Sequence, residues 1–248
     1  MLTSTERLGR TRLRVSPGTG TGRCRVRTAT TQSDATASVV RPVLVAHDRD
    51  RARVSLVPEG ALLLAGDAVE IDVTVDPGMS LDLVEPGGTV AFDMRGGTAR
   101  WDVRIDLGAG ARLTWAGLPF VVSEGADVSR SLRVRCGRDA RLLLREVLVL
   151  GRYGEGPGRL RQTSTVLDGD GRPVLVEDLP LSPSSTALLL GGHRVLASVL
   201  ALGTDLPAGD DPDRYDLATP GAVLWRRLGH HAHEAELAAV WRQVTGER

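Results

Sequence analysis

Cys136-Gly137-Arg138-Asp139-Ala140-Arg141-Leu142-Leu143-Leu144 carries the chain from one apolar strand, through a four-residue turn, into a second apolar strand. The same order of strand, turn and strand occurs at 75–83, 107–115 and 167–175. The four copies lie about 30 residues apart, a period that is typical of stacked repeats. The sequence therefore predicts strand-turn-strand units that stack on one another.

Apolar and polar residues alternate on both sides of these turns. The odd-numbered residues from Val69 to Val75 are apolar and alternate with Glu, Asp and Thr, as in a half-buried strand. Gly and Asp in the turns supply positive φ and local hydrogen bonds. The helical period is absent from 66 to 181. We therefore expect an all-β fold of stacked sheets, of solenoid or sandwich type.

A single domain, 1–248, is expected, because no segment has the composition of a linker. Residues 1–40 are polar and rich in Thr, Ser and Gly, which predicts a loosely structured N-terminal region. Near the other end, Leu237, Val240 and Trp241 follow the spacing of an amphipathic helix. The sequence therefore predicts a small C-terminal helical part at 231–245.

The composition excludes several classes of function. The chain has 31 basic and 31 acidic residues and no net charge, so no basic field for a nucleic acid stands out. Every basic residue is Arg, which excludes chemistry that needs a lysine amine. Cys24 and Cys136 are too few for a disulfide framework or a thiolate metal site. No apolar run reaches the ~18 residues of a membrane span, and we expect a cytoplasmic protein.

Carboxylates recur at one position of the repeat. Glu85, Glu146 and Glu177 each stand two residues beyond the last apolar residue of their copy. Because side chains on a strand alternate between its faces, Glu146 shares a face with Leu144, and Glu177 with Leu175. Two interpretations follow. The carboxylates form an interior row, where they must be paired, bonded or used, or a twist or bulge turns them to solvent. Asp67 has the same ambiguity.

Histidines gather at one place, where His230, His231 and His233 precede the predicted helix. Imidazole is a ligand for nickel, copper and zinc, so these residues are candidates for a weak metal contact at the surface. The metalloprotease pattern is absent, because no His follows His233 at the required spacing. The alternative interpretation is a polar helix start.

The order of several motifs resembles the urease accessory protein family UreD, also called UreH. The matching residues are Ala65-Gly66-Asp67, Asp76-Pro77-Gly78, Pro86-Gly87-Gly88-Thr89, Leu113-Thr114-Trp115, Glu146-Val147-Leu148-Val149-Leu150-Gly151-Arg152, Leu175-Val176-Glu177 and Trp225-Arg226-Arg227-Leu228-Gly229. The family's Gly-Gly-Asp is Ala65-Gly66-Asp67 here, so the chain is similar to a divergent member.

The resemblance implies a scaffold without catalytic activity. Such a chaperone would bind apo-urease and the accessory protein UreF, with UreG recruited in turn, for nickel delivery. It would bind no cofactor stably, and nickel would pass through it. Asp67, Thr89, Glu146 and Glu177 are the residues that the resemblance assigns to an interior nickel passage, and Gly151 and Arg152 are family motif residues.

Two other classes of function remain open. A β-solenoid carbohydrate-active enzyme would use a pair of carboxylates, and Glu146 with Glu177 is a candidate pair. The scarcity of aromatic residues, 3% of the chain, speaks against sugar binding. A generic β-rich interaction module without a metal role is the third interpretation.

Overall fold

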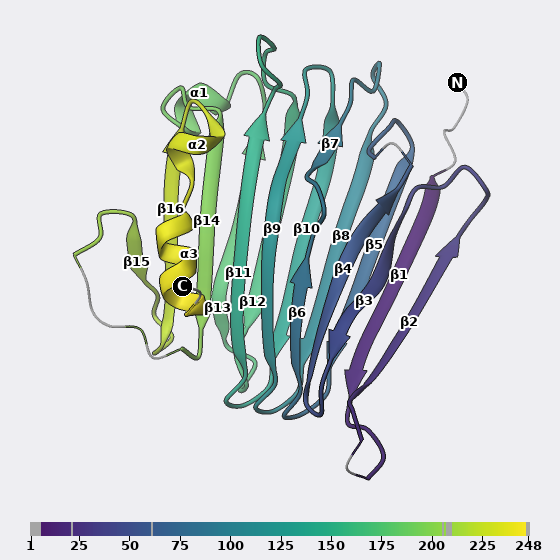
Figure 1. The fold of residues 1–248 in the computed structure, drawn as a ribbon. Coiled ribbons are helices and arrows are strands. Elements are labelled where there is room, and N and C mark those ends of the chain that lie inside the picture. Colours follow the sequence, from purple (N-terminus) through teal and green to yellow (C-terminus); the bar gives the residue numbers. More distant parts are fainter. Residues whose placement is uncertain (1–5, 21, 61, 205, 207–209, 247–248) are drawn as a thin grey trace.

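Two β-sheets packed face to face make up most of the structure (Figure 1). This computed structural model describes residues 6–20, 22–60, 62–204, 206 and 210–246. Within those residues, sheet A has seven strands, in the order β13 (Pro173–Leu181), β12 (Arg159–Leu167), β10 (Asp127–Cys136), β8 (Ala99–Leu107), β5 (Asp67–Val75), β1 (Arg7–Ser16) and β2 (Arg25–Gln32).

Sheet B forms the second layer and has nine strands within the same ranges. Eight of them follow in the order β15 (Arg214–Asp216), β16 (Ala222–Gly229), β14 (Val195–Leu202), β11 (Arg141–Leu150), β9 (Arg112–Val122), β6 (Ser80–Val84), β4 (Arg51–Glu59) and β3 (Val39–His47). The short strand β7 (Thr89–Ala91) pairs with β9 beyond the end of β6. The predicted fold class, all-β stacked sheets, is confirmed.

Three of the four sequence repeats cross from one sheet to the other. β5 leads to β6, β8 to β9 and β10 to β11 through four-residue turns, and each new strand lies parallel to its predecessor in the same sheet. The fourth copy differs, because β12 and β13 form an antiparallel hairpin within sheet A. Asp168 accepts hydrogen bonds from the backbone N–H of Asp170 and Arg172, which closes the turn. The expectation of four equivalent copies was wrong for this one, and Glu177 therefore lies on the opposite sheet from Glu146.

The N-terminal region is more ordered than expected. β1 lies inside sheet A, parallel to β5 and antiparallel to β2. Its residues Leu13 and Val15 are fully buried, while Arg10 on the other face pairs with Glu70 of β5 at 2.5 Å. The prediction of a loosely structured 1–40 was wrong for 7–16 and 25–32, because carboxylates on β5 neutralise the arginines of β1.

Short helices complete the fold. α1 (Thr186–Leu189) follows β13, and the expected helix at 231–245 is divided into α2 (Ala232–Ala235) and α3 (Ala238–Thr245). The interruption falls at Glu236, whose backbone is extended. Val240 and Trp241 of α3 pack on the outer face of sheet B, over β11 and β14, and α2 lies over β16. Among the described residues, no helix has the length and apolar character needed to cross a membrane.

Candidate functional site

A line of irregular pairing crosses the middle of sheet B. β6 ends at Val84 before β7 begins at Thr89, and the register between β9 and β11 shifts between Arg145 and Val147. Backbones approach closely here, since a Cβ on Gly117 would lie 2.4 Å from the carbonyl oxygen of Arg145. Only glycine fits such a contact. Glu85 and Glu146 lie on this line.

Glu85 is enclosed between the two sheets. Its carboxylate accepts hydrogen bonds from Nε1 of Trp115 at 2.9 Å and from the backbone N–H of Leu118 at 2.8 Å. Burial raises the pKa of Glu85, although the two hydrogen bonds act in the opposite direction. The structure thus directs the first carboxylate of the repeat inwards.

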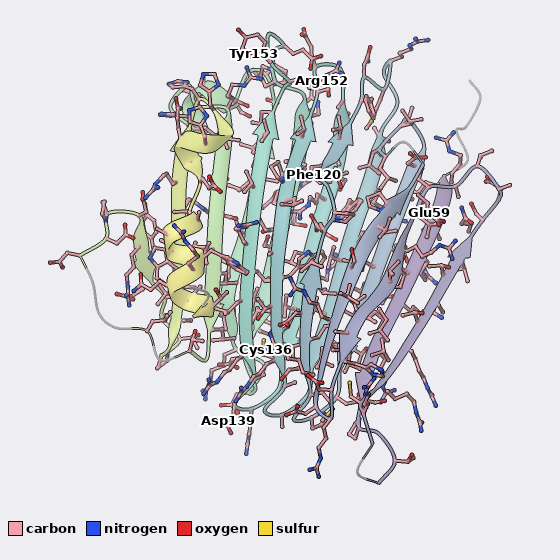
Figure 2. All side chains as sticks on the ribbon, viewed as in Figure 1. Glu59, Phe120, Cys136, Asp139, Arg152 and Tyr153 are labelled. Carbon is pink, nitrogen blue, oxygen red and sulfur yellow. The ribbon has the colours of Figure 1, made fainter. Side chains whose placement is uncertain are left out.

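Glu146 also points inwards, as its parity with Leu144 predicts, and it meets an arginine from the opposite sheet. Nη1 of Arg130 on β10 lies 2.6 Å from Oε1 of Glu146 and 2.7 Å from Oε1 of Gln162. The Arg130 guanidinium lies 5.3 Å from the ring centre of Phe120, whose place on β9 is labelled in Figure 2. Nε of Arg130 is buried and has no partner among the described residues. The ion pair therefore joins the sheets.

Glu177 reaches the interior from sheet A. Both of its oxygens bind the guanidinium of Arg226 on β16, at 2.6 and 3.0 Å. Nε of the same arginine donates to Oγ of Ser198 at 3.3 Å. This second ion pair also spans the two sheets. Its bidentate geometry, with two parallel N–H···O hydrogen bonds, fixes the orientation of the Arg226 guanidinium.

Three small cavities follow one another between the sheets, with volumes of about 10, 40 and 20 Å³. Glu85 and Thr89 line both the first and the second cavity, and Glu146 lines both the second and the third. Glu177 and Arg226 line the third. A void of about 10–15 Å³ holds one water molecule, so the series has room for single waters or ions.

Comparisons with known proteins decide the family. The family model described as "UreD urease accessory protein" matches residues 8–244. "Urease accessory protein UreD 1" of Streptomyces griseus subsp. griseus is 50% identical over 210 residues, covering 82% of this chain and 81% of that relative. "Urease accessory protein UreD" of Streptomyces avermitilis is 36% identical over 179 residues, 70% of each protein. The chain belongs to the UreD family. The predicted resemblance is confirmed.

In this UreD-family chain, Asp67 lies apart from the other candidate residues. It is buried at the start of β5, where Arg7 binds it at 2.8 Å and the backbone N–H of Leu64 donates to it at 2.8 Å. It lines a separate groove of about 840 Å³ at the upper end of sheet A, not the three cavities. Thr89, Glu146 and Glu177 are thus brought into one series, and Asp67 is not. Their role in nickel transit stays a prediction.

Four of the five histidines of this UreD-family chain form two stacked pairs. His193 stacks on His230 with ring centres 4.5 Å apart, and His231 stacks on His233 at 5.6 Å. Glu234 accepts hydrogen bonds from the backbone N–H of His230 and His231, which caps α2. Among the described residues, no three His, Cys, Asp or Glu side chains are grouped to hold a metal ion. The observed contacts agree with the interpretation of these histidines as a polar helix start. Weak metal binding by them stays a prediction.

The family motif residues Gly151 and Arg152 shape the loop after β11. Gly151 has φ +83°, and a Cβ there would lie 2.3 Å from the carbonyl oxygen of Gly156. Arg152 pairs with Glu155 at 2.5 Å and holds the pKa of that carboxyl at about 2. Both residues therefore fix the loop conformation.

Arg130 and Arg226 are the interior residues that sequence reasoning missed. Arg130 has the same parity as Leu132 and Val134 on β10, so the alternation of the strand already indicates an inward side chain. Arg226 likewise shares parity with Leu224 on β16. The strand alternation predicts that each arginine side chain points inwards, but it does not predict which carboxylate the arginine pairs with.

Proposed function

We propose that this UreD-family chain is a cytoplasmic scaffold of urease maturation, without catalytic activity of its own. It binds apo-urease and a UreF-type protein, which recruits a UreG-type protein, and it offers nickel a route to the urease active site. The observation that carries the proposal is the series of cavities lined by Glu85, Thr89, Glu146 and Glu177, in a member of the UreD family. Spaced oxygen ligands that hold an ion weakly suit transit better than storage.

Passage of a cation requires the interior ion pairs to open. Arg130 and Arg226 neutralise Glu146 and Glu177 in this conformation. A divalent ion that reaches Glu146 replaces the guanidinium as its partner, and the arginine then moves towards its other acceptor, Gln162. The carboxylate thus exchanges one cation for another and is never left unpaired in a dry interior.

The carbohydrate-active enzyme is the less favoured alternative. A glycosidase needs space for a sugar ring between its carboxylates, and ligand pockets usually measure about 300–1,000 Å³. The cavity that Glu146 shares with Glu177 has a volume of about 20 Å³, and Arg226, which also lines it, binds Glu177. Each carboxylate already has an arginine partner.

Reconstitution tests the proposed function. Purified apo-urease, the UreF-type and UreG-type proteins, nickel and GTP are incubated with and without the chain, and urease activity is measured. We expect activation to depend on the chain, and the chain to co-purify with the partners. Equal activation without the chain, in the absence of any co-purification, would refute the proposal.

A further inference from the structure

The outer faces of the two sheets differ in chemistry. On sheet A, the outward side chains form ion pairs between strands, such as Arg10 with Glu70 and Arg12 with Asp72. On sheet B, the outward side chains are charged at the first residues of the central strands, as for Arg51 and Asp82, which pair at 2.5 Å. Towards the other end of the same strands they are apolar and half-buried, as for Val57, Val84, Pro119, Val121, Val147 and Val149. The terminal helices cover one side of this face, since α3 contacts β11 and β14 and α2 contacts β16, and Figure 1 shows β9, β6 and β4 beyond them without a helix in front. Val147 and Val149 of β11 pack against the cluster that includes α2 and α3, whereas no described helix packs on the outer face of β9, β6 and β4.

A groove deepens the upper end of this face. Its lining includes Pro119, Val121 and Val149 of the two strands together with Tyr153 and His230, around a volume of about 330 Å³. Tyr153 is 95% exposed, and Figure 2 shows it at the upper end of the molecule, beyond Arg152. An exposed tyrosine beside an apolar groove is typical of a protein interface, where one aromatic side chain contributes a large share of the affinity.

The charges that line the groove are positive. Arg152 and Arg194 are the charged residues of its lining, whereas Glu155 and Glu234 lie outside it. Glu155 binds Arg152, and Glu234 is occupied by the backbone N–H groups of α2. Arg194 donates to the carbonyl oxygens of Gly151 and Arg152 at 2.5 Å, and no carboxylate among the described residues pairs with it. A complementary ligand therefore carries carboxylates beside its apolar surface.

We propose that the groove docks an amphipathic segment of a partner protein, with apolar side chains on the valines of sheet B and Asp or Glu side chains facing Arg194. The segment completes the apolar cover that α3 begins over β14, and Tyr153 closes over its end. This inference rests on the proposed function, since it supplies the surface by which a maturation scaffold holds one of its protein partners.

The test measures binding of the full chain to two purified probes separately, a UreF-type protein and apo-urease. Tyr153→Ser changes a side chain that makes little contact within the fold, and Val121→Glu places a charge in the groove. We expect each change to weaken the binding of at least one probe about tenfold or more, because central contacts dominate such interfaces. Raising the salt from about 0.05 to 0.5 M should also weaken that binding in the wild-type chain.

Two matched changes on sheet A serve as controls. Val176→Glu alters a valine of β13 that is 69% exposed, and Arg133→Glu reverses an exposed arginine of β10. We expect wild-type affinity for both controls and near wild-type thermal unfolding for Tyr153→Ser, so that a loss of binding reports on the groove and not on folding.

Three results would overturn the inference. Wild-type affinity of Tyr153→Ser and Val121→Glu for both probes would show that the groove is not the docking site. A homodimer of the chain alone that Val121→Glu dissociates would assign the groove to a second copy. If the wild-type chain binds neither probe, the proposed function fails and the inference fails with it, which distinguishes this result from the first.

Discussion

Arg130 on β10 and Glu146 on β11 connect the two sheets through a single contact of 2.6 Å between Nη1 and Oε1. The two side chains are 14% and 25% exposed, so the pair is largely removed from water. Loss of one member leaves the other with an unmatched charge in the interior, which costs more than loss of both. The candidate passage and the stability of the fold therefore depend on the same residues.

A double-mutant cycle measures this coupling. We expect Arg130→Met to lower the free energy of unfolding by about 1–3 kcal/mol, because Glu146 and Gln162 lose their shared donor. Arg130→Met combined with Glu146→Gln should be less destabilised than the sum of the two single changes, by about 1 kcal/mol or more. Urea unfolding of the four proteins provides the measurement. Additive effects would show that the two residues do not interact in solution.

Removing the charge of Glu146 and Glu177 distinguishes a role in nickel transit from a role in holding the two sheets together. Glu146→Gln and Glu177→Gln keep the size of the side chain and an acceptor oxygen while removing the charge. We expect partner binding to persist and urease activation to fall, most in the double variant and at limiting nickel. Glu59→Gln is the control, because it removes an exposed carboxylate that pairs with Arg41 on the edge of sheet B. Unchanged activation in the double variant would end the passage hypothesis, and joint loss of folding and binding would favour a structural role.

The pH dependence of stability reports on Glu85. Burial raises its pKa above the ordinary value of 4.5, so the folded state binds the proton more tightly than the unfolded state. Stability from this group is present below pH 4.5 and is lost as the pH rises through the raised pKa. We expect the wild-type chain to lose stability relative to Glu85→Gln over that window in urea unfolding. Relative to Glu59→Gln, the wild-type chain should instead gain stability as the pH rises, because the hydrogen bond from Arg41 lowers the pKa of Glu59 in the folded state.

The isolated chain should associate with itself at modest concentration. Its net charge is zero, and Val43, Leu44 and Val45 are exposed in succession on the edge strand β3. Val45→Lys should raise the concentration at which the chain stays in solution, as light scattering can measure, and co-expression with the UreF-type protein should raise the soluble yield. A wild-type chain that remains monomeric alone at high concentration would contradict this prediction.

Nickel should bind the isolated chain weakly. Among the described residues, the interior carboxylates Glu146 and Glu177 are already paired with arginines, and the histidines stack in pairs without a third ligand nearby. Calorimetry should therefore find no stoichiometric site tighter than the micromolar range, and the purified chain should have no hydrolase activity. A sub-micromolar nickel site would refute this expectation.

The alternation of apolar and polar residues along each strand was enough to predict which way the carboxylates point. The inward direction of Glu146 and Glu177 follows from the parity of their own strands, which the sequence records directly. What each carboxylate meets is a property of the assembled sheets. Arg226 lies 49 residues from Glu177 along the chain, and no local pattern relates them.

The errors have the same physical origin. Arg10 and its neighbours on β1 suggest a polar, loose segment until the carboxylates of β5 lie beside them. The turns before β11 and before β13 look alike in sequence, yet one leads across to the other sheet and one returns within the sheet. The backbone hydrogen bonds that Asp168 accepts close the turn before β13, and the apolar pattern does not distinguish the two turns.

The three crossing turns have a consequence for how the chain can change in length. Since β5, β8 and β10 lie in one sheet and β6, β9 and β11 in the other, removing one repeat takes a strand from both layers at once. Removal of a single strand would reverse the direction of every later strand relative to its neighbours. Between β5 and β11, a deletion or duplication that keeps the crossing pattern therefore removes or adds about 30 residues and one strand in each layer.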